Sequence, residues 1–209
     1  MEPVPNQTMT PTKRLFDLFT ATVLSVFVVP AIAVIAVVIV LIEGGPVFHS
    51  AERMKTPRQG FRFYKFRTMR PDPDDTGVSG GDKTDRITPL GAFLRRTRLD
   101  ELPQLFNLFR GDISVVGPRP PLRQYVERFP DVYEQVLQAR PGITGLATIY
   151  FNRHERRLLA RSRTPAQTDE IYCRACIPRK ARLDLIYLAN QGFCFDLAII
   201  LKTFVPSLR

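Results

Sequence analysis

The chain has 209 residues, of which 24% are charged and 44% hydrophobic, a composition that excludes wholesale disorder and a collagen-like or disulfide-scaffold protein. Its formal charge of +10 predicts a partner that carries negative charge: nucleic acid, anionic lipid or a phosphorylated small molecule. The mean hydropathy of −0.07 excludes a transporter with many spans. The three cysteines cannot all pair with one another, which indicates a reducing compartment.

The N-terminal part of the chain predicts a membrane segment. Residues 1–12 are rich in Pro and Thr, have no apolar period, and are expected to form a flexible tail. Leu18–Ile42 contains no charged residue, and about 20 helical residues suffice to cross the hydrocarbon layer of a bilayer. No small-residue cleavage site follows, so a removable signal peptide is disfavoured. We predict a membrane helix over residues 13–45.

Pro30 lies near the middle of this segment and cannot donate a hydrogen bond to the carbonyl of Val26, so a break or kink is expected there. Each half is too short to cross the bilayer alone. Basic residues flank the segment on both sides: Lys13 and Arg14 before it, and Arg53, Lys55 and Arg58 after it. The preference of basic flanks for the cytoplasm favours a re-entrant hairpin. A kinked spanning helix is compatible with the same residues.

The remaining chain reads as a mixed, mostly helical domain. Residues 61–69 interleave aromatic and basic residues and predict a strand or one arm of a hairpin. Residues 71–89 are rich in Pro, Gly and Asp and predict a long, mobile, exposed loop. Helical spacing occurs over residues 90–98, 104–110, 122–139, 180–190 and 193–205. The last of these could lie in the membrane interface or close the core.

Asp100 and Glu101 form the first candidate site. Pro103 is tolerated only in the first turn of a helix, so the two carboxylates are expected at or just before a helix N-terminus, which favours their ionised forms. Such a position suits a nucleophile or a metal ligand, and it equally suits an ordinary helix cap. The residues expected to form a buried stripe behind this site are Leu102, Leu105, Phe106 and Phe109.

A set of cations forms the second candidate: Lys65, Arg67, Arg95, Arg98 and Arg119. Prolines fix the backbone on both sides of Arg119, and a rigidly held guanidinium can bind phosphate with two hydrogen bonds. A solvated arginine in a polyproline turn is the alternative. The turn over residues 140–145 could place backbone N–H groups against an anion, or serve as an ordinary turn.

Cys173 and Cys176 have the spacing of a half zinc site, but His49, His154 and Cys194 lack matching ligand spacing. We therefore interpret this cysteine pair as reduced thiols. No Ser-His-Asp order and no nucleophile elbow is present.

Four motifs in one order, KRLFD, YKFRTM, DELPQLFNLFRGDISVVGPRPP and RPGITG, make the chain resemble the bacterial sugar transferase family, the small monotopic polyprenyl-phosphate phosphoglycosyl transferases. The resemblance runs from about Lys13 to the C-terminus, and the long third motif is highly specific. It implies an α+β, mostly helical fold with a short β-hairpin. Residues 13–45 would form a re-entrant helix-break-helix, and residues 46–209 a cytoplasmic catalytic domain with interfacial helices.

The resemblance also implies an activity. A sugar-1-phosphate would pass from a UDP-sugar to undecaprenyl phosphate at the bacterial inner membrane, with release of UMP, as the first membrane step of surface-glycan assembly. Asp100 would be the nucleophile that forms an aspartyl-phosphosugar, with Glu101 as the second essential carboxylate. Mg²⁺ would be required at this pair, with Lys65, Arg95 and Arg119 around the phosphates. Splitting the transfer in two lets each anionic substrate meet the carboxylate in turn.

Two features depart from the pattern or stay unexplained. The family commonly has a polar residue before the proline at the membrane break, whereas Val29 precedes Pro30 here. The basic segment 150–163 could shape the sugar pocket or bind lipid headgroups.

The competing functions are a conventional glycosyltransferase that releases UDP, and a basic membrane adaptor that binds nucleic acid or protein. The adaptor leaves the Asp100–Glu101 motif unexplained, so no nucleic-acid partner is expected. The sugar, the glycan pathway and the oligomeric state, a homodimer included, are left open.

Overall fold

The computed structural model describes residues 10–73 and 77–205, and within them the predicted fold class, α+β and mostly helical, is confirmed. The helices are α1 (Pro11–Glu43), α2 (Pro89–Thr97), α3 (Gln104–Arg110), α4 (Arg123–Arg128), α5 (Pro130–Val136), α6 (Leu146–Tyr150), α7 (Asn152–Leu159), α8 (Pro165–Ile171), α9 (Ile177–Ala189) and α10 (Phe193–Phe204). Shorter turns are η1 (Gly81–Arg86), η2 (Leu99–Glu101) and the π-helical η3 (Tyr172–Cys176).

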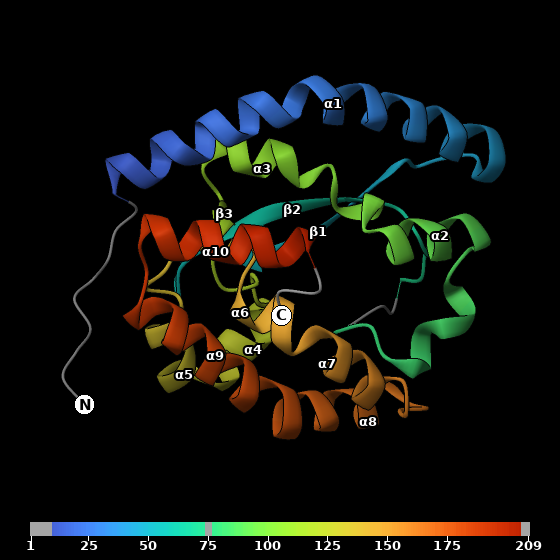
Figure 1. Ribbon diagram of the computed structural model, residues 1–209. Helices are drawn as coiled ribbons and strands as arrows, with labels where there is room; N and C mark the ends of the chain where they lie inside the picture. Colours follow the sequence, from blue (N-terminus) through green and yellow to red (C-terminus); the bar gives the residue numbers. More distant parts are fainter. Residues whose placement is uncertain (1–9, 74–76, 206–209) are drawn as a thin grey trace.

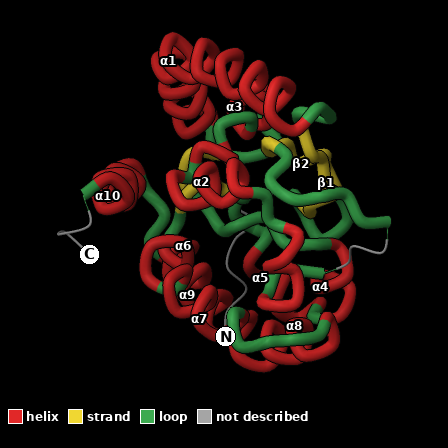
Figure 2. Tube along the Cα trace, turned by 90° about the vertical axis from the view of Figure 1, so that its right-hand side faces the viewer, coloured by secondary structure: helices red, strands yellow, loops and turns green. Residues whose placement is uncertain are grey.

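The strands form two small sheets. Antiparallel β1 (Phe48–Met54) and β2 (Gly60–Phe66) are the predicted hairpin, and parallel β3 (Ser114–Val116) and β4 (Gly142–Thr144) form the second pair. Figures 1 and 2 show α1 and α3 on one side of the molecule, the hairpin in the middle, and α4 to α9 on the opposite side. The interior between these layers holds the site described below.

Helix α1 begins two residues before the predicted start. Thr10 caps it by accepting a hydrogen bond from the Lys13 backbone N–H at 3.2 Å, and Pro11 occupies the first turn, where its missing N–H costs nothing. Of the predicted tail, residues 1–9 lie outside the described residues. The helix is continuous through Pro30 and Figure 1 shows it as one curved ribbon, so the expected break is a bend within one helix and not a gap between two.

Both ends of α1 are attached to the rest of the domain. At its start, Lys13 Nζ lies 2.5 Å from Asp196 Oδ2 of α10, and Arg14 donates to the Leu108 and Phe109 carbonyls at the end of α3. At its other end, Arg67 donates to the carbonyls of Glu43 and Gly45. These contacts explain Arg14 of KRLFD and Arg67 of YKFRTM as hydrogen-bond donors to carbonyls at the ends of α3 and α1.

One face of α1 is buried along most of its length. Asp17 is fully buried and accepts hydrogen bonds from Ser114 Oγ at 3.0 Å and the Val115 N–H at 3.1 Å. Ala21 packs in the main core with Leu108 and Val116, and farther along the helix Ile32 and Ile39 pack with residues of β2 and α2. The long apolar helix therefore lies along the domain (Figure 1).

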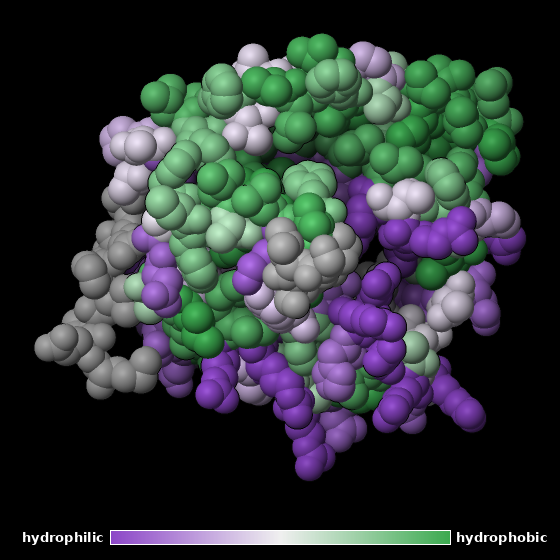
Figure 3. Space-filling view, viewed as in Figure 1, coloured by the Kyte–Doolittle hydropathy of each residue, from purple (hydrophilic) through white to green (hydrophobic). Residues whose placement is uncertain are grey.

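The opposite face of α1 is exposed and apolar. Leu15, Phe19, Phe27, Val34 and Leu41 are each more than half exposed. Figure 3 shows green surface over α1 and over α10, whose exposed apolar residues are Phe193, Leu197, Leu201 and Phe204. Hydrophilic surface gathers in the lower part of the same view, below α10 (Figure 3). A contiguous apolar face of this kind marks an interaction site, here consistent with membrane association.

Two predictions about exposure were wrong. Phe106 and Phe109 are 49% and 39% exposed, whereas Leu105 and Leu108 are the buried apolar residues of α3. Residues 77–89 do not form a loop in solvent: Gly81 donates to Ser162 Oγ, Thr168 Oγ1 donates to Asp82 Oδ1, and Lys83 is 6% exposed. The described part of this segment packs on α8 and walls the central cavity.

Candidate active site

A cavity of about 990 Å³ opens between the hairpin, the segment from 77 to 86, and helices α7 and α9. Asp100, Glu101, Lys65, Arg95 and Arg119 all line it. The structure thus brings together every residue that the sequence predicts for the site, from four separate segments. A cavity of this size is large enough for a nucleotide sugar.

Asp100 and Glu101 lie in the turn η2, between α2 and α3. Helix α2 ends at Thr97, and Arg98 adopts a left-handed backbone with φ of 63°, which turns the chain into η2. Leu99 and Leu102 pack toward α1, so the two carboxylates between them face the cavity. The predicted position just before a helix N-terminus is confirmed.

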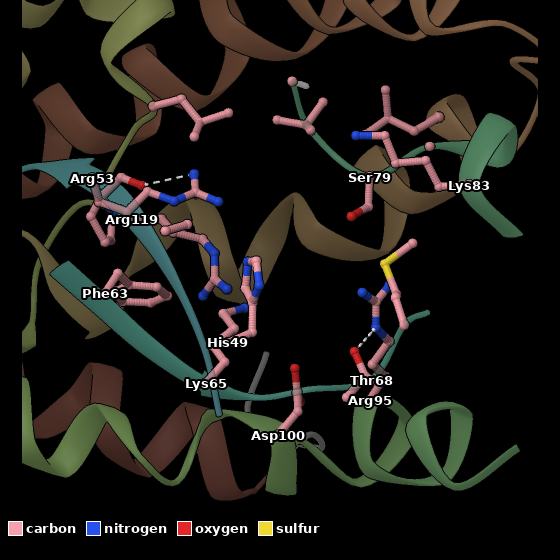
Figure 4. Close-up of a pocket in the computed structure, with 18 of the residues that line it drawn as sticks. His49, Arg53, Phe63, Lys65, Thr68, Ser79, Lys83, Arg95, Asp100 and Arg119 are labelled. Carbon is pink, nitrogen blue, oxygen red and sulfur yellow. Dashed lines mark hydrogen bonds between the residues drawn. The ribbon is translucent and has the colours of Figure 1, made fainter. Parts of the chain in front are cut away.

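Asp100 is 6% exposed, and its Oδ1 is buried without a hydrogen-bond partner among the described residues. Figure 4 shows this carboxylate directed into the cavity. Burial raises the pKa of Asp100, and the nearby Lys65 charge opposes this shift. A buried oxygen without a partner is costly and is expected where a ligand supplies the missing contact.

Three cationic side chains contact the Glu101 carboxylate. Its Oε1 lies 2.5 Å from Arg119 Nη2 and 3.2 Å from both Lys65 Nζ and Arg98 Nη1. Burial alone would raise its pKa, but these three cations outweigh burial and hold the pKa of Glu101 well below its usual range. Glu101 is therefore ionised and positions the cations, whereas Asp100 keeps an unpartnered oxygen.

The cations differ in their electrostatics. Burial lowers the pKa of Lys65 to about 8, although Glu101 opposes the shift. The Glu101 carboxylate raises the pKa of Arg119, so Arg119 stays charged over the whole pH range in which the protein would be assayed. Arg95 Nε donates to Thr68 Oγ1 at 2.8 Å, which orients its guanidinium beside the cavity (Figure 4).

Several residues that line the cavity lie outside the set predicted from the sequence. In the hairpin, His49 pairs with Lys65 and Ala51 with Phe63, so the alternation of β1 places His49 and Arg53 on the same face as Lys65. That cross-strand pattern was a usable signal. Two causes lower the pKa of Arg53 to about 10: burial, which has the larger effect, and the nearby charge of Arg119. On the opposite wall lie Glu155, Lys180 and Asp184, for which no local motif exists.

The glycines of GPRPP and RPGITG serve backbone packing and not anion binding. Gly117 N–H donates to the Thr144 carbonyl at 2.8 Å, and Gly142 N–H donates to the Pro118 carbonyl at 2.7 Å. A Cβ on Gly142 would collide with the backbone nitrogen of Gly117. The two motifs thus meet at the parallel strands β3 and β4 and hold the segment that presents Arg119.

Gly142→Ala is expected to lower the free energy of unfolding by about 2 kcal/mol, because the added methyl group forces β4 away from Gly117. Thermal unfolding in detergent measures the change. Gly45→Ala is the matched control, since a Cβ there meets nothing within 4 Å. Equal stability of the two variants would contradict the packing role.

Among the described residues, no group of three or more His, Cys, Asp or Glu side chains is arranged to hold a metal ion. Cys173 and Cys176 are free and buried, as expected for reduced thiols. The cavity does fit a magnesium ion with few protein ligands, because Asp100 offers a buried oxygen, and Mg²⁺ commonly fills its other positions with water and substrate phosphate. Glu101, the other expected ligand, has both carboxylate oxygens hydrogen-bonded to Arg119.

The sequence model of the family described as Bacterial sugar transferase matches residues 8–209. The chain belongs to the bacterial sugar transferase family. The matched region contains α1, the hairpin, the carboxylate turn and both glycine motifs, so the whole cavity lies within it.

Three relatives show what this sugar transferase family member is similar to. It is 37% identical over 207 residues to the exopolysaccharide production protein PSS of Rhizobium leguminosarum bv. phaseoli, covering 94% of each chain. It is 36% identical to a UDP-glucose:undecaprenyl-phosphate glucose-1-phosphate transferase of Caulobacter vibrioides, covering 99% of this chain and 73% of the relative. It is 42% identical over 118 residues to a putative undecaprenyl-phosphate N-acetylgalactosaminyl 1-phosphate transferase of Bacillus subtilis, covering 56% of this chain and 66% of the relative.

Proposed function

We propose that this family member transfers a sugar-1-phosphate from a UDP-sugar to undecaprenyl phosphate and releases UMP, as the first membrane step of exopolysaccharide or capsule assembly. The observation that carries the proposal is the unpartnered Asp100 oxygen in a cavity walled by cations, beside a long apolar helix. Two relatives whose names state transfer of a sugar-1-phosphate to this lipid support the choice of substrates.

The first half-reaction uses Asp100 as the nucleophile. Its carboxylate oxygen forms a bond to the β-phosphorus of the UDP-sugar, and the bond from that phosphorus to the oxygen bridging it to the α-phosphate breaks. UMP leaves with the bridging oxygen, and an aspartyl-phosphosugar stays behind. Lys65, Arg95 and Arg119 neutralise the charge on the phosphates, while Glu101 holds Lys65 and Arg119 in place.

The second half-reaction transfers the phosphosugar to the lipid. A phosphate oxygen of undecaprenyl phosphate attacks the same phosphorus, and the Asp100 carboxylate leaves in its original state. The product is undecaprenyl diphosphate-sugar. We propose Mg²⁺ as the cofactor: when bound beside Asp100, it would supply further neutralisation of the substrate phosphates.

We further propose that α1 is re-entrant, with both ends and the catalytic domain on the cytoplasmic side of the inner membrane. Both ends of α1 contact the same domain, through Lys13 and Arg14 at one end and Arg67 at the other. A helix that spanned the bilayer while packed along the domain would draw the charged cavity into hydrocarbon, at a high cost in desolvation. The exposed apolar faces of α1 and α10 would instead enter one leaflet.

Cysteine labelling tests this topology. Thr12→Cys reports the exposed start of α1, and Arg157→Cys reports the catalytic domain, both in a Cys194→Ser background that removes the one exposed cysteine of the described chain. In inverted and right-side-out vesicles, a membrane-impermeant maleimide should label both sites from the cytoplasmic side only. Labelling of the two sites from opposite sides would establish a spanning helix.

The pH dependence should reflect Lys65. Because burial lowers its pKa to about 8, Lys65 loses its charge as the pH rises through this value, and kcat/KM for the UDP-sugar should fall there. Lys65→Arg keeps the charge at higher pH and should move the alkaline limb upward, whatever its effect on the plateau. Rates between about pH 6 and pH 10 measure both profiles. An unchanged alkaline limb in the variant would assign it to another group.

Nucleotide release tests the proposed function directly. The purified protein is given undecaprenyl phosphate, Mg²⁺ and, in turn, UDP-glucose, UDP-galactose, UDP-N-acetylglucosamine and UDP-N-acetylgalactosamine. Release of UMP with at least one donor supports phosphosugar transfer, provided that multiple turnovers occur only when the lipid acceptor is present. Release of UDP would instead make the protein a conventional glycosyltransferase.

A further inference from the structure

The wall of the cavity opposite the carboxylate turn carries a second charged cluster: Glu155 of α7 with Lys180 and Asp184 of α9. Lys180 Nζ donates to Glu155 Oε1 at 2.8 Å and to the Tyr172 hydroxyl at 3.3 Å. Asp184 lies one helical turn after Lys180 and therefore on the same face of α9. Figures 1 and 2 show α7 and α9 across the molecule from α3.

Asp184 is the unusual member of this cluster. It is 6% exposed, it lines the cavity, and it forms no hydrogen bond or ion pair with the described part of the chain. Burial raises its pKa to about 7, although the Lys180 charge opposes the shift. A carboxyl group that lines a cavity without a protein partner is available to a hydrogen-bond donor on a bound ligand.

The cluster stands close to the reacting groups. The charges of Glu101, Glu155 and Asp100 all raise the pKa of Arg119, and Arg119 lines the same cavity as the cluster and the carboxylate turn. In the proposed reaction Arg119 binds the phosphate that carries the sugar. A sugar attached to that phosphate would be within the same cavity as Glu155, Lys180 and Asp184.

The chemistry of the cluster matches a sugar. Carboxylates accept hydrogen bonds from hydroxyl groups, and an ammonium group donates to them, so two carboxylates that flank Lys180 can bind neighbouring hydroxyls. Tyr172 also lines the cavity, and its hydroxyl accepts a hydrogen bond from Lys180 Nζ, which holds the ammonium group beside Glu155. A uracil ring has one N–H donor and would leave the second carboxylate without a partner.

We propose that Glu155, Lys180 and Asp184 bind the hydroxyl groups of the donor sugar and select which UDP-sugar reacts; this inference rests on the proposed function. It also gives a place to the basic segment 150–163. Arg153 and Arg157 of α7 are exposed, while Glu155, the one acidic residue of this helix, faces the cavity. In this proposal the segment shapes the sugar pocket through Glu155, and Arg156 of the same helix also lines the cavity.

Binding measurements on the full chain test the inference. In an Asp100→Asn background, which prevents turnover, calorimetry compares UDP with the UDP-sugar that the wild-type protein uses best. Asp184→Asn should weaken binding of the UDP-sugar about tenfold, the loss of one charge-assisted hydrogen bond, and leave binding of UDP unchanged. Glu155→Gln is the second variant, should Asp184→Asn fail to fold. Glu170→Gln, on the exposed surface of α8 and away from the cavity, is the matched control.

The outcomes separate the inference from the proposed function. Equal weakening of UDP and UDP-sugar would place the nucleotide at this wall and overturn the inference, and so would unchanged binding of both ligands. The Asp100→Asn background prevents turnover and therefore gives no kcat/KM values. The kcat/KM ratios among the four donors are measured for the same variants in the protein with Asp100 intact. A wild-type protein that releases no UMP from any donor would refute the proposed function itself.

Discussion

Asp100→Asn is expected to lower UMP release by at least about 10⁴-fold, because an amide is a poor nucleophile and cannot form the aspartyl-phosphosugar. The change is nearly isosteric, and Oδ1 of Asp100 has no hydrogen-bond partner among the described residues, so folding and membrane association should be retained. Burial raises the pKa of this carboxyl in the wild-type protein, so removing its charge should not destabilise the fold.

Mass spectrometry of the intact protein gives an independent readout of the same prediction. With UDP-sugar and Mg²⁺ but no lipid acceptor, the wild-type protein should gain the mass of one phosphosugar, and Asp100→Asn should gain none. Asp131→Asn, an exposed residue of α5 away from the cavity, serves as the control and should behave like the wild type. A covalent adduct on the Asp100→Asn protein would assign the nucleophile to another residue.

Arg119→Ala is expected to lower kcat/KM by about 10²- to 10³-fold, the effect of removing one charged donor from a developing phosphoryl charge. The variant also takes from Glu101 its closest partner, which leaves Lys65 and Arg98 to compensate a buried carboxylate. Steady-state kinetics should show a lower kcat as well as a higher KM, since the guanidinium acts on the transferring phosphate.

Two further variants refine this prediction. Arg119→Lys should recover part of the loss, because the charge returns without the two-pronged geometry. Arg123→Ala removes a guanidinium four residues away that pairs with Glu52 on the surface, and it should change kcat/KM by less than about threefold. Full activity of Arg119→Ala would reduce Arg119 to a structural partner of Glu101.

The residues that could be predicted from the sequence are those whose signal is local. The uncharged run of α1, the helix start after Pro103 and the proline-held Arg119 each depend on neighbours within a few positions. The parallel pairing of β3 with β4 joins segments 26 residues or more apart, and no local pattern indicates it. The sequence does not predict the cluster of Glu155, Lys180 and Asp184 for the same reason. Only the fold brings α7 and α9 to the cavity of the carboxylate turn.

A different limit explains the error on α3. Apolar spacing indicates which residues avoid water, and it does not distinguish a protein core from a lipid-facing surface. Phe106 and Phe109 satisfy the helical period but are exposed, as are the apolar residues on the outer face of α1. The prediction of a buried stripe was right for Leu105 and wrong for these two aromatic residues.

The attachment of α1 at both ends has a consequence for how the two substrates arrive. A tether held at one end would let the catalytic domain swing, whereas Lys13, Arg14 and Arg67 leave no free hinge between the apolar face and the cavity. In the proposed topology this attachment would hold the mouth of the cavity at a constant height and tilt above the bilayer. In the proposed reaction, the lipid phosphate would then reach the cavity by diffusion in the plane of the membrane, and the UDP-sugar would reach it from solution.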